Sequence, residues 1–328
     1  MFVEKPKSIL HFILIFVICF SFALGSNYIL NKVTMSNMIY TTNIPRKIGA
    51  SYMTYNNPFY TVINEEVSKI VKEHGDSLIT LDPSMSIKKQ REQIEYLIDQ
   101  QVDALIVTPV DFDGLGSTLK KAYEANIPVI TVDTQVNDSK YVTYSIVSDN
   151  YDAGVKCAKD MMRKLDHANI VLLEHTKAES GYLRIQGFLD TIKNNSNYRV
   201  VKRIECLGQL ENAMPKMEAY IDKNTDFNVV MCLNDPSALG AMAALDAKGI
   251  LDGKYVYGID GTPEAKKMIE EGKMTATVAQ SPKRFGKKAG QLLYEMFSMK
   301  KIKKKNYVYP VSIVTKENIQ KYSLEGWQ

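Results

Sequence analysis

The sequence predicts an α/β protein with two lobes, each built on a doubly wound parallel sheet, and three observations support that prediction. After residue 46, short apolar runs alternate with segments of helical periodicity along almost the whole chain. Apolar runs such as 104–107 show no polar alternation, which is typical of strands covered on both faces. The alternation restarts after Asp149. Two successive runs of this kind predict two lobes with a cleft between them.

The first run of elements lies between residues 48 and 132. Strands are expected at its apolar runs, and helices where apolar residues recur every three or four positions, as at Val67, Ile70 and Val71. Because each strand leads through a helix to another strand, these are parallel βαβ units. The expected strands are 48–51, 77–81, 104–107 and 128–132, and the expected helices are 59–74, 87–100 and 115–125.

The second run of elements fills the rest of the body by the same criteria. Its last member is expected to be a strand that ends the folded part. The expected helices are 152–165, 184–193, 213–223, 238–248, 265–271 and 284–298, and the expected strands are 170–173, 198–204, 229–232, 255–258, 276–279 and 307–314.

Composition bounds the class of protein. The chain has 328 residues, enough for about two domains, and its 45% hydrophobic and 24% charged content is ordinary for a globular protein. A net charge of +4 is too small to indicate nucleic acid, and the basic run 300–305 is interpreted as a solvated loop. The four cysteines lack metal-ligand spacing, and nucleotide-loop and hydrolase signatures are absent. We therefore expect no cofactor and no metal.

The N-terminal segment is expected to lie outside the fold. Residues 9–30 contain no Asp, Glu, Lys or Arg, and two lysines precede them. This pattern predicts a signal anchor within residues 1–30, with the N-terminus in the cytoplasm and the body outside the cell membrane. Residues 31–46 then form a tether. The alternative is a cleaved signal peptide, for which 23–25 offers a small-residue cleavage site.

Two carboxylates stand at the ends of expected strands. Asp133 follows the strand 128–132, and Asp260 comes two residues after the strand 255–258. Open α/β sheets bind ligands at strand ends, and an ionised carboxylate accepts hydrogen bonds from adjacent sugar hydroxyls. The alternative is that each Asp only caps the turn or helix that follows it.

Aromatic rings follow the first expected strand. Phe59 and Tyr60 offer faces that suit the C–H faces of a sugar ring, although one of them could be a core residue. Asn57, which precedes Pro58, could be a ligand contact or the N-cap of the next helix.

Three further polar side chains lie near strand ends or helix starts. Arg184 offers five hydrogen-bond donors in a fixed fork, with a surface salt bridge as the alternative role. The amides of Asn234 and Gln280 can both donate and accept. Carboxylates, amides and aromatic rings together suit a neutral molecule with several hydroxyls, which describes a sugar.

From about residue 47 to 314 the chain resembles the type I periplasmic sugar-binding proteins, and most closely the ribose-binding group. The resemblance rests on the order and spacing of several segments taken together. The matching segments are 57–60, 126–133, 148–150, 234–235, 258–263 and 276–280. The resemblance implies that the sugar is contacted by Asn57, Phe59, Tyr60, Asp133, Arg184, Asn234, Asp260 and Gln280.

Two positions depart from the ribose-binding pattern. Thr134 stands where ribose binders carry an Arg, so we expect it at the site but with a specificity other than ribose. The segment 207–211 lacks the aromatic residue usual in the family, and Tyr182 is the candidate for a replacement wall.

The resemblance also implies a mechanism. Two lobes joined by a three-crossing hinge close on the sugar, which shifts the equilibrium as far as it prefers the closed form. The crossings are expected near 146–149, 280–282 and 309–311. They divide the body into an N-terminal lobe of 47–147 plus 281–309 and a C-terminal lobe of 148–280 plus 310–328.

The expected function is therefore extracytoplasmic binding of a monosaccharide, a pentose such as xylose or a hexose, without catalysis. An uncleaved anchor resembles the membrane-bound sugar sensors, xylose sensors among them, that pair with a LytS-type histidine kinase. The alternative is a binding protein that feeds an ABC importer and its permease. A lesser alternative is a glycosidase with Asp133 and Asp260 as its carboxylate pair. A sugar-responsive repressor is disfavoured, since an apolar span stands where DNA-binding helices would precede the body.

Overall fold

The computed structural model describes residues 25–26, 45–224, 226–298 and 305–328. The predicted anchor and tether lie almost wholly outside these ranges, as does most of the basic run 300–305. Within the described ranges, no helix combines the length and the apolar character needed to cross a membrane. Residues 46–328 form one compact unit, which contains both lobes.

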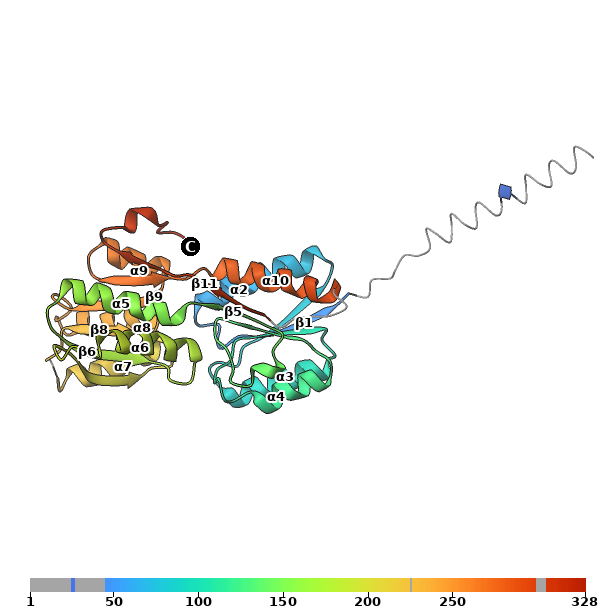
Figure 1. The fold of residues 1–328 in the computed structure, drawn as a ribbon, viewed down its shortest axis with the longest axis horizontal. Helices are drawn as coiled ribbons and strands as arrows, with labels where there is room; N and C mark the ends of the chain where they lie inside the picture. Colours follow the sequence, from blue (N-terminus) through green and yellow to red (C-terminus); the bar gives the residue numbers. More distant parts are fainter. Residues whose placement is uncertain (1–24, 27–44, 225, 299–304) are drawn as a thin grey trace, which may run out of the picture. The chain divides into compact units, whose positions relative to one another are not determined.

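The first lobe is built on a six-stranded, all-parallel sheet with the strand order β11-β5-β4-β3-β1-β2. Helices lie on both faces of this sheet (Figure 1). Its elements are β1 (Lys47–Ser51), α2 (Pro58–Glu73), β2 (Ser77–Leu81), α3 (Ile87–Asp99), β3 (Ala104–Val107), α4 (Gly116–Glu124), β4 (Val129–Val132), the 3₁₀ turn η1 (Ser139–Tyr141), β5 (Tyr144–Ser148), α10 (Pro282–Ser298) and β11 (Lys305–Tyr309).

The second lobe has a six-stranded sheet of the order β12-β10-β9-β8-β6-β7. Five strands run parallel, whereas β12 pairs antiparallel with β10, so the expectation of a wholly parallel sheet is wrong at this edge. The elements are α5 (Asn150–Lys164), β6 (Ala168–Glu174), α6 (Glu179–Ile192), β7 (Tyr198–Glu205), α7 (Leu210–Ile221), β8 (Val229–Cys232), α8 (Asp235–Ala247), β9 (Tyr255–Asp260), α9 (Pro263–Glu270), β10 (Ala276–Ala279), β12 (Ser312–Thr315) and the 3₁₀ turn η2 (Ile319–Lys321).

The chain passes from one sheet to the other three times. The passages lie between β5 and α5, between β10 and α10, and between β11 and β12. The strand expected over 307–314 is wrong as one element, because β11 and β12 belong to different sheets. Pro310 stands between them, and a proline cannot donate to a strand ladder. The two lobes are therefore connected by three short segments close together in the fold.

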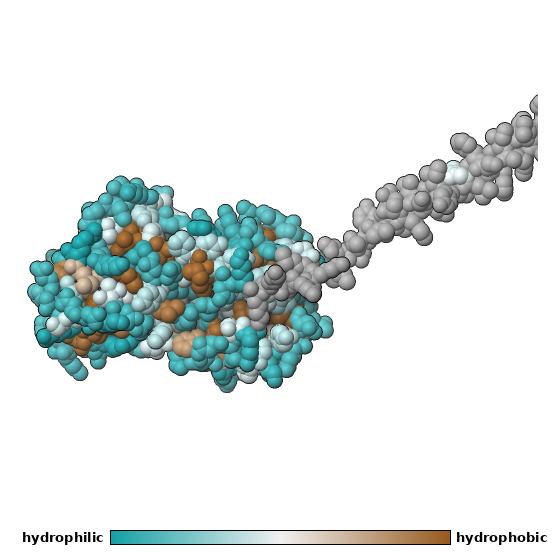
Figure 2. Space-filling model, viewed as in Figure 1, coloured by the Kyte–Doolittle hydropathy of each residue, from teal (hydrophilic) through white to brown (hydrophobic). Residues whose placement is uncertain are grey.

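The buried apolar side chains form one large cluster in the second lobe and two clusters in the first. On the face shown in Figure 2, hydrophilic residues cover most of both lobes and hydrophobic residues show only in separate small patches. Helix α10 returns to the first lobe and packs against α2, where Gly286 permits the approach. A Cβ at this position would lie 2.5 Å from the carbonyl oxygen of Ile63.

Candidate functional site

A cavity lies between the carboxyl ends of the two sheets. Its empty space is about 380 Å³ with the solvent at its mouth included. The first lobe contributes Met53, Asn57, Phe59, Tyr60 and Asp133 to the lining, and the second contributes His175, Ala178, Ser180, Arg184, Leu207, Gly208, Gln209, Leu233, Asn234 and Asp260.

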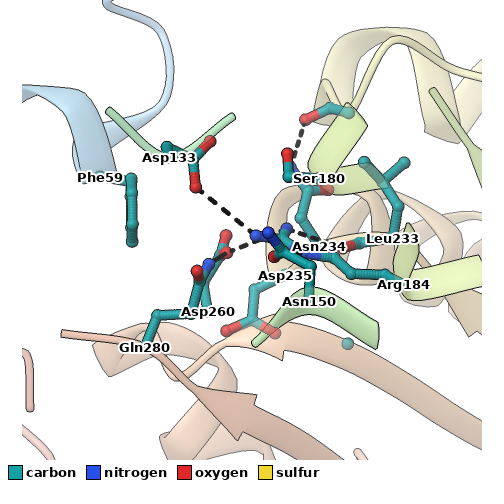
Figure 3. A network of polar contacts seen from close by, with 12 residues as sticks. Phe59, Asp133, Asn150, Ser180, Arg184, Leu233, Asn234, Asp235, Asp260 and Gln280 are labelled. Atoms are coloured by element: carbon teal, nitrogen blue, oxygen red, sulfur yellow. Dashed lines mark hydrogen bonds and ion pairs between the residues drawn. The ribbon is translucent and has the colours of Figure 1, made fainter. Parts of the chain in front are cut away.

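Two carboxylates from different lobes meet one guanidinium in this cavity (Figure 3). Asp133 follows β4 directly, and Asp260 is the last residue of β9. An Nη2 atom of Arg184 lies 3.6 Å from Oδ1 of Asp133, and its Nη1 atom lies 3.7 Å from Oδ1 of Asp260. All three side chains are buried. The two strand-end carboxylates that the sequence places more than a hundred residues apart thus share a single cation.

Both aspartates hold their side chains in the cavity through an uncommon backbone conformation. Their φ angles are 72° at Asp133 and 144° at Asp260, in a region that favours glycine. Non-glycine residues held at positive φ collect at ligand sites, where the surrounding fold compensates for the strain. The helix that follows Asp260 is capped by Thr262, so the capping role considered for Asp260 is not the one it has.

Close helix packing positions Arg184. A Cβ at Gly154 of α5 would lie 1.8 Å from the carbonyl oxygen of Arg184, so only glycine lets α5 and α6 approach this closely. The Nε atom of Arg184 donates to Oδ1 of Asn150 at 2.9 Å, and Nη1 donates to the carbonyl oxygen of Leu233 at 3.1 Å. These bonds fix the guanidinium in the second lobe, facing the first.

The two amide residues support the site differently. Oδ1 of Asn234 accepts from the backbone N–H of Ser237 and caps α8, while its Nδ2 donates to the carbonyl oxygen of Gly208. Gln280 stands outside the cavity lining and donates through Nε2 to Oδ1 of Asp260 at 2.7 Å. Asn234 therefore shapes the wall, and Gln280 holds the carboxylate from behind.

The aromatic wall belongs to the first lobe. The hydroxyl of Tyr60 donates to Oδ2 of Asp133 at 3.0 Å, and the Phe59 ring stands edge-on to that of Tyr60 with centroids 5.7 Å apart. Asn57 caps α2 by accepting from the N–H of Phe59, so its capping role is present although it also lines the cavity. Tyr182 is 51% exposed and does not line the cavity, so it is no replacement wall.

Four polar atoms of this cluster are buried and have no hydrogen-bond partner within the described part of the chain. An unsatisfied buried polar atom is unfavourable, and a group of them facing one space points to a ligand. The atoms are Oδ1 of Asp133, Nη2 of Arg184, Oδ2 of Asp260 and Oε1 of Gln280. Three of them belong to residues of the cavity lining and offer two carboxylate acceptors and one guanidinium nitrogen as donor, which matches a molecule that mainly donates through hydroxyls.

Burial dominates the electrostatics of the site. Loss of solvent raises the pKa of Asp133, while Arg184 and the Tyr60 hydroxyl lower it. The pKa of Asp260 is raised well above its ordinary value by burial, against the lowering effect of Arg184. Burial also raises the pKa of Tyr60, next to these carboxylates. The two carboxylates are consequently easier to protonate than ordinary aspartates.

The lobes also touch around the cavity. Oγ1 of Thr134 accepts from the backbone N–H of Ser180 at 3.1 Å, so Thr134 is buried between the lobes and does not line the cavity. The amide of Gln135 bonds the carboxylate of Glu179 at 3.2 Å. At the rim, Nδ2 of Asn56 donates to Glu211 at 3.1 Å. Thr134 therefore lies at the lobe contact that a hinge motion would break.

Sequence reasoning missed the lining residues that come from loops, among them Met53, His175, Leu207, Gln209 and Leu233. No periodic pattern marks them. Leu207 adopts a φ of 56°, which the conformational preference of leucine does not predict. In the described part of the chain, no cluster of His, Cys, Asp and Glu is placed to hold a metal ion.

Comparisons with known sequences agree with this architecture. The family described as periplasmic binding protein domain matches residues 48–301. The ribose import binding protein of Bacillus subtilis is 30% identical over 259 residues, which cover 78% of this chain and 83% of that protein. The D-allose-binding periplasmic protein of Escherichia coli is 26% identical, covering 71% and 78% of the two chains.

Solved structures share the fold. An ABC transporter solute-binding protein of Agrobacterium vitis with bound D-fucose has a TM-score of 0.79 at 28% identity, covering 84% of this chain and 97% of that one. A solute-binding protein of Bacillus halodurans with bound myo-inositol has a TM-score of 0.78 at 26% identity, with coverages of 84% and 96%. The chain belongs to the periplasmic binding protein family, in its type I, ribose-binding-like branch.

Proposed function

We propose that this protein is an extracytoplasmic receptor that binds a monosaccharide between its two lobes. The proposal rests on one observation. Asp133 and Asp260 both contact Arg184, and each of the three side chains has a buried polar atom without a hydrogen-bond partner among the described residues. Hydrogen bonds to charged groups are stronger than neutral ones, and two carboxylates can each accept from adjacent hydroxyls.

The composition of the cavity defines the ligand class. The described lining carries two carboxyl groups and one guanidinium that already contacts both, which disfavours sugar phosphates and uronic acids. The Phe59 ring lines one side and offers an apolar face to the C–H groups of a sugar ring. Relatives named for ribose and D-allose, and a structure with bound D-fucose, support a neutral monosaccharide. The proposal leaves pentoses such as xylose and hexoses as the candidates.

Relatives also bear on the enzyme alternative. They are named as binding proteins, and none of those cited here is named as a glycosidase. Arg184 lies between Asp133 and Asp260 and contacts both. Carboxylates that only bind are the simpler interpretation, and the glycosidase alternative has no support.

The first experiment is a thermal-shift panel on residues 46–328, the compact unit, with pentoses and hexoses. A ligand that binds only the folded state increases the free energy of unfolding, by about 2.7 kcal/mol at a hundredfold excess over its Kd. The unfolding midpoint therefore rises. We expect a shift with one or two neutral sugars, and none in Asp133→Ala. The matched control is Lys267→Met, at an exposed position on α9. Its unfolding midpoint should shift with sugar as that of the wild type does. A flat panel would contradict the proposal.

We further propose that the body is held outside the cytoplasmic membrane by residues 9–30, with the N-terminus inside, and that sugar-dependent closure is read by a membrane histidine kinase. The apolar segment 9–30 supports this proposal. A partner can be coupled to the sugar only if it distinguishes the open from the closed form. Mass spectrometry of the protein from cell membranes tests the anchor, since a cleaved N-terminus would contradict it.

The second candidate partner is an ABC permease, which the relatives named import binding proteins favour. Deletion of the gene separates the two. The kinase proposal predicts that uptake of radiolabelled sugar persists while induction of sugar-metabolism genes is lost. The import candidate predicts the loss of high-affinity uptake itself.

A further inference from the structure

The C-terminal segment 322–328 bridges the two lobes. It follows β12 and η2, which belong to the second lobe. Tyr322 and Leu324 pack against the apolar cluster of that lobe. Trp327 packs instead against the cluster of the first lobe. Figure 1 marks the C-terminus between the α9 and α10 regions. We call residues 322–328 the strap.

A buried lysine anchors the strap to the second lobe. Lys266 of α9 is fully buried, and its Nζ donates to the carbonyl oxygens of Ser323 and Gly326. Among the described residues, no carboxylate lies within ion-pair distance of this amine. Burying an ammonium group is unfavourable unless it is hydrogen-bonded, and the carbonyls of the strap supply those bonds, while the charges of Asp235 and Glu264 add to the compensation. The strap is therefore a docked part of the fold.

At its other end the strap reaches the wall of the sugar cavity. The Trp327 ring stands edge-on to that of Phe59, with centroids 5.6 Å apart and planes at 71°. Phe59 is held on another side by Phe285, at 6.0 Å, and itself lines the cavity. Trp327 does not line the cavity. It supports from behind the ring that faces the ligand.

We propose that the strap couples the two lobes behind the sugar site, and that Trp327 is a positioning residue that holds the Phe59 ring against the ligand. The proposal rests on the proposed sugar site. Because Lys266 fixes the strap to the second lobe and Trp327 touches the first, the strap favours the arrangement in which both contacts are made. It adds to the three chain passages and to the polar contacts between the lobes around the cavity.

Substitutions at Trp327 test the positioning role in the full-length protein. Calorimetric titration with D-ribose, D-xylose and D-allose gives the Kd of each sugar that binds. Trp327→Ala is expected to raise that Kd about tenfold, as the loss of an aromatic contact of this kind would. Trp327→Phe should restore binding to within roughly threefold of the wild type, because a ring again supports Phe59. An unchanged Kd in Trp327→Ala would overturn the proposal.

A second measurement tests the strap without any sugar. Trp327 is the only tryptophan of the chain, so intrinsic tryptophan fluorescence reports its surroundings alone. Lys266→Met removes the amine that holds the strap, and we expect a red-shifted emission and stronger quenching by acrylamide. Lys267→Met, its exposed neighbour on α9, is the matched control and should leave both unchanged. Wild-type emission and quenching in Lys266→Met would refute the anchoring.

The two measurements separate failure of this inference from failure of the proposed function. If the wild type binds none of the sugars but Lys266→Met exposes Trp327, the strap stands and the sugar proposal fails. If sugars bind and neither substitution has an effect, the strap fails while the sugar site stands. Should Lys266→Met not fold, Trp327→Ala still decides the positioning role by itself.

Discussion

The two lobes contribute unequal halves of the cavity. The first lobe supplies its aromatic rings, Phe59 and Tyr60, and one carboxylate. The second lobe supplies Arg184, which is the only Lys or Arg among the described lining residues, together with Asp260. The first half recognises the apolar side of a ligand, whereas the second carries most of the charge. In the proposed function neither half is a complete sugar site, so binding would require both lobes.

The difference extends to how each carboxylate is held. Asp133 accepts from the neutral hydroxyl of Tyr60 within its own lobe, and its counter-charge comes from the other lobe. Asp260 has Arg184 and the Gln280 amide in its own lobe, but it also lies near Asp235, whose like charge raises its pKa further. The first carboxylate takes its cation from the other lobe, while the second has its cation and its amide donor in its own lobe.

The largest expected effect comes from removing the shared cation. Arg184→Met leaves two buried carboxylates uncompensated, and breaking a buried pair destabilises a protein by about 3–5 kcal/mol. We expect a loss of that order by chemical denaturation, and no detectable sugar binding. Arg199→Met, at an exposed arginine of the same lobe, should change stability by less than about 0.5 kcal/mol. Wild-type binding by Arg184→Met would show that the lobes do not differ in the way described.

The next effect distinguishes the two carboxylates. Asn keeps the size of Asp and tolerates positive φ, so Asp133→Asn and Asp260→Asn remove charge without forcing the backbone to move. Each should weaken sugar binding by about 1.5–3 kcal/mol, the value of a hydrogen bond to a charged group. Asp260→Asn should raise the unfolding midpoint of the unliganded protein more than Asp133→Asn does, because it also relieves the repulsion between Asp260 and Asp235. Equal midpoints in the two variants would contradict the asymmetry between the lobes.

A smaller effect is expected from pH, with opposite signs for binding and stability. Burial raises the pKa of both Asp133 and Asp260, so protonation begins nearer to neutral pH than for ordinary aspartates. Protonated carboxyls lose acceptor capacity, so the Kd of the sugar should rise as pH falls from 7.5 towards 5.

The stability contribution of these two groups runs the other way. Their folded-state pKa values exceed the unfolded value, so the folded state binds more protons in that window. Their burial therefore destabilises the fold at neutral pH, and this cost is relieved as pH falls through the raised pKa values. Titrations of Asp133→Asn should show a flatter dependence of Kd on pH. A wild-type Kd independent of pH over this range would count against ionised carboxylates as the acceptors.

The strand-end residues could be predicted from the sequence because parallel strands bring their carboxyl ends to one edge. Asp133 and Asp260 lie where that argument puts them, and so does Tyr60 at the start of α2. The strand β5 was missed because two serines interrupt its apolar residues, although all five of its residues are buried.

Contacts made by irregular segments could not be predicted in this way. Leu207 and His175 reach the cavity from loops, and the local sequence does not determine which part of the fold a loop contacts. The contact of Trp327 with Phe59 joins residues from opposite ends of the body, and it depends on the distant anchor Lys266. Tyr182, the candidate for a replacement wall, lies within α6, which begins at Glu179 rather than at Arg184, and its side chain is exposed.

The smallest expected effect comes from Thr134, and it tests whether closure of the lobes brings the two halves of the cavity together. Thr134→Val keeps the shape of the side chain but removes the acceptor of the Ser180 N–H, which lies in the other lobe. The unpaired N–H is unfavourable only where it is buried, in the closed form, by about 1 kcal/mol, so sugar binding should weaken roughly fivefold. Thr131→Val removes a hydroxyl bonded to Ser145 within the first sheet. This control should lower the unfolding midpoint without changing the Kd. If the two variants behaved alike, the Thr134 contact would stabilise the fold and play no part in closing it.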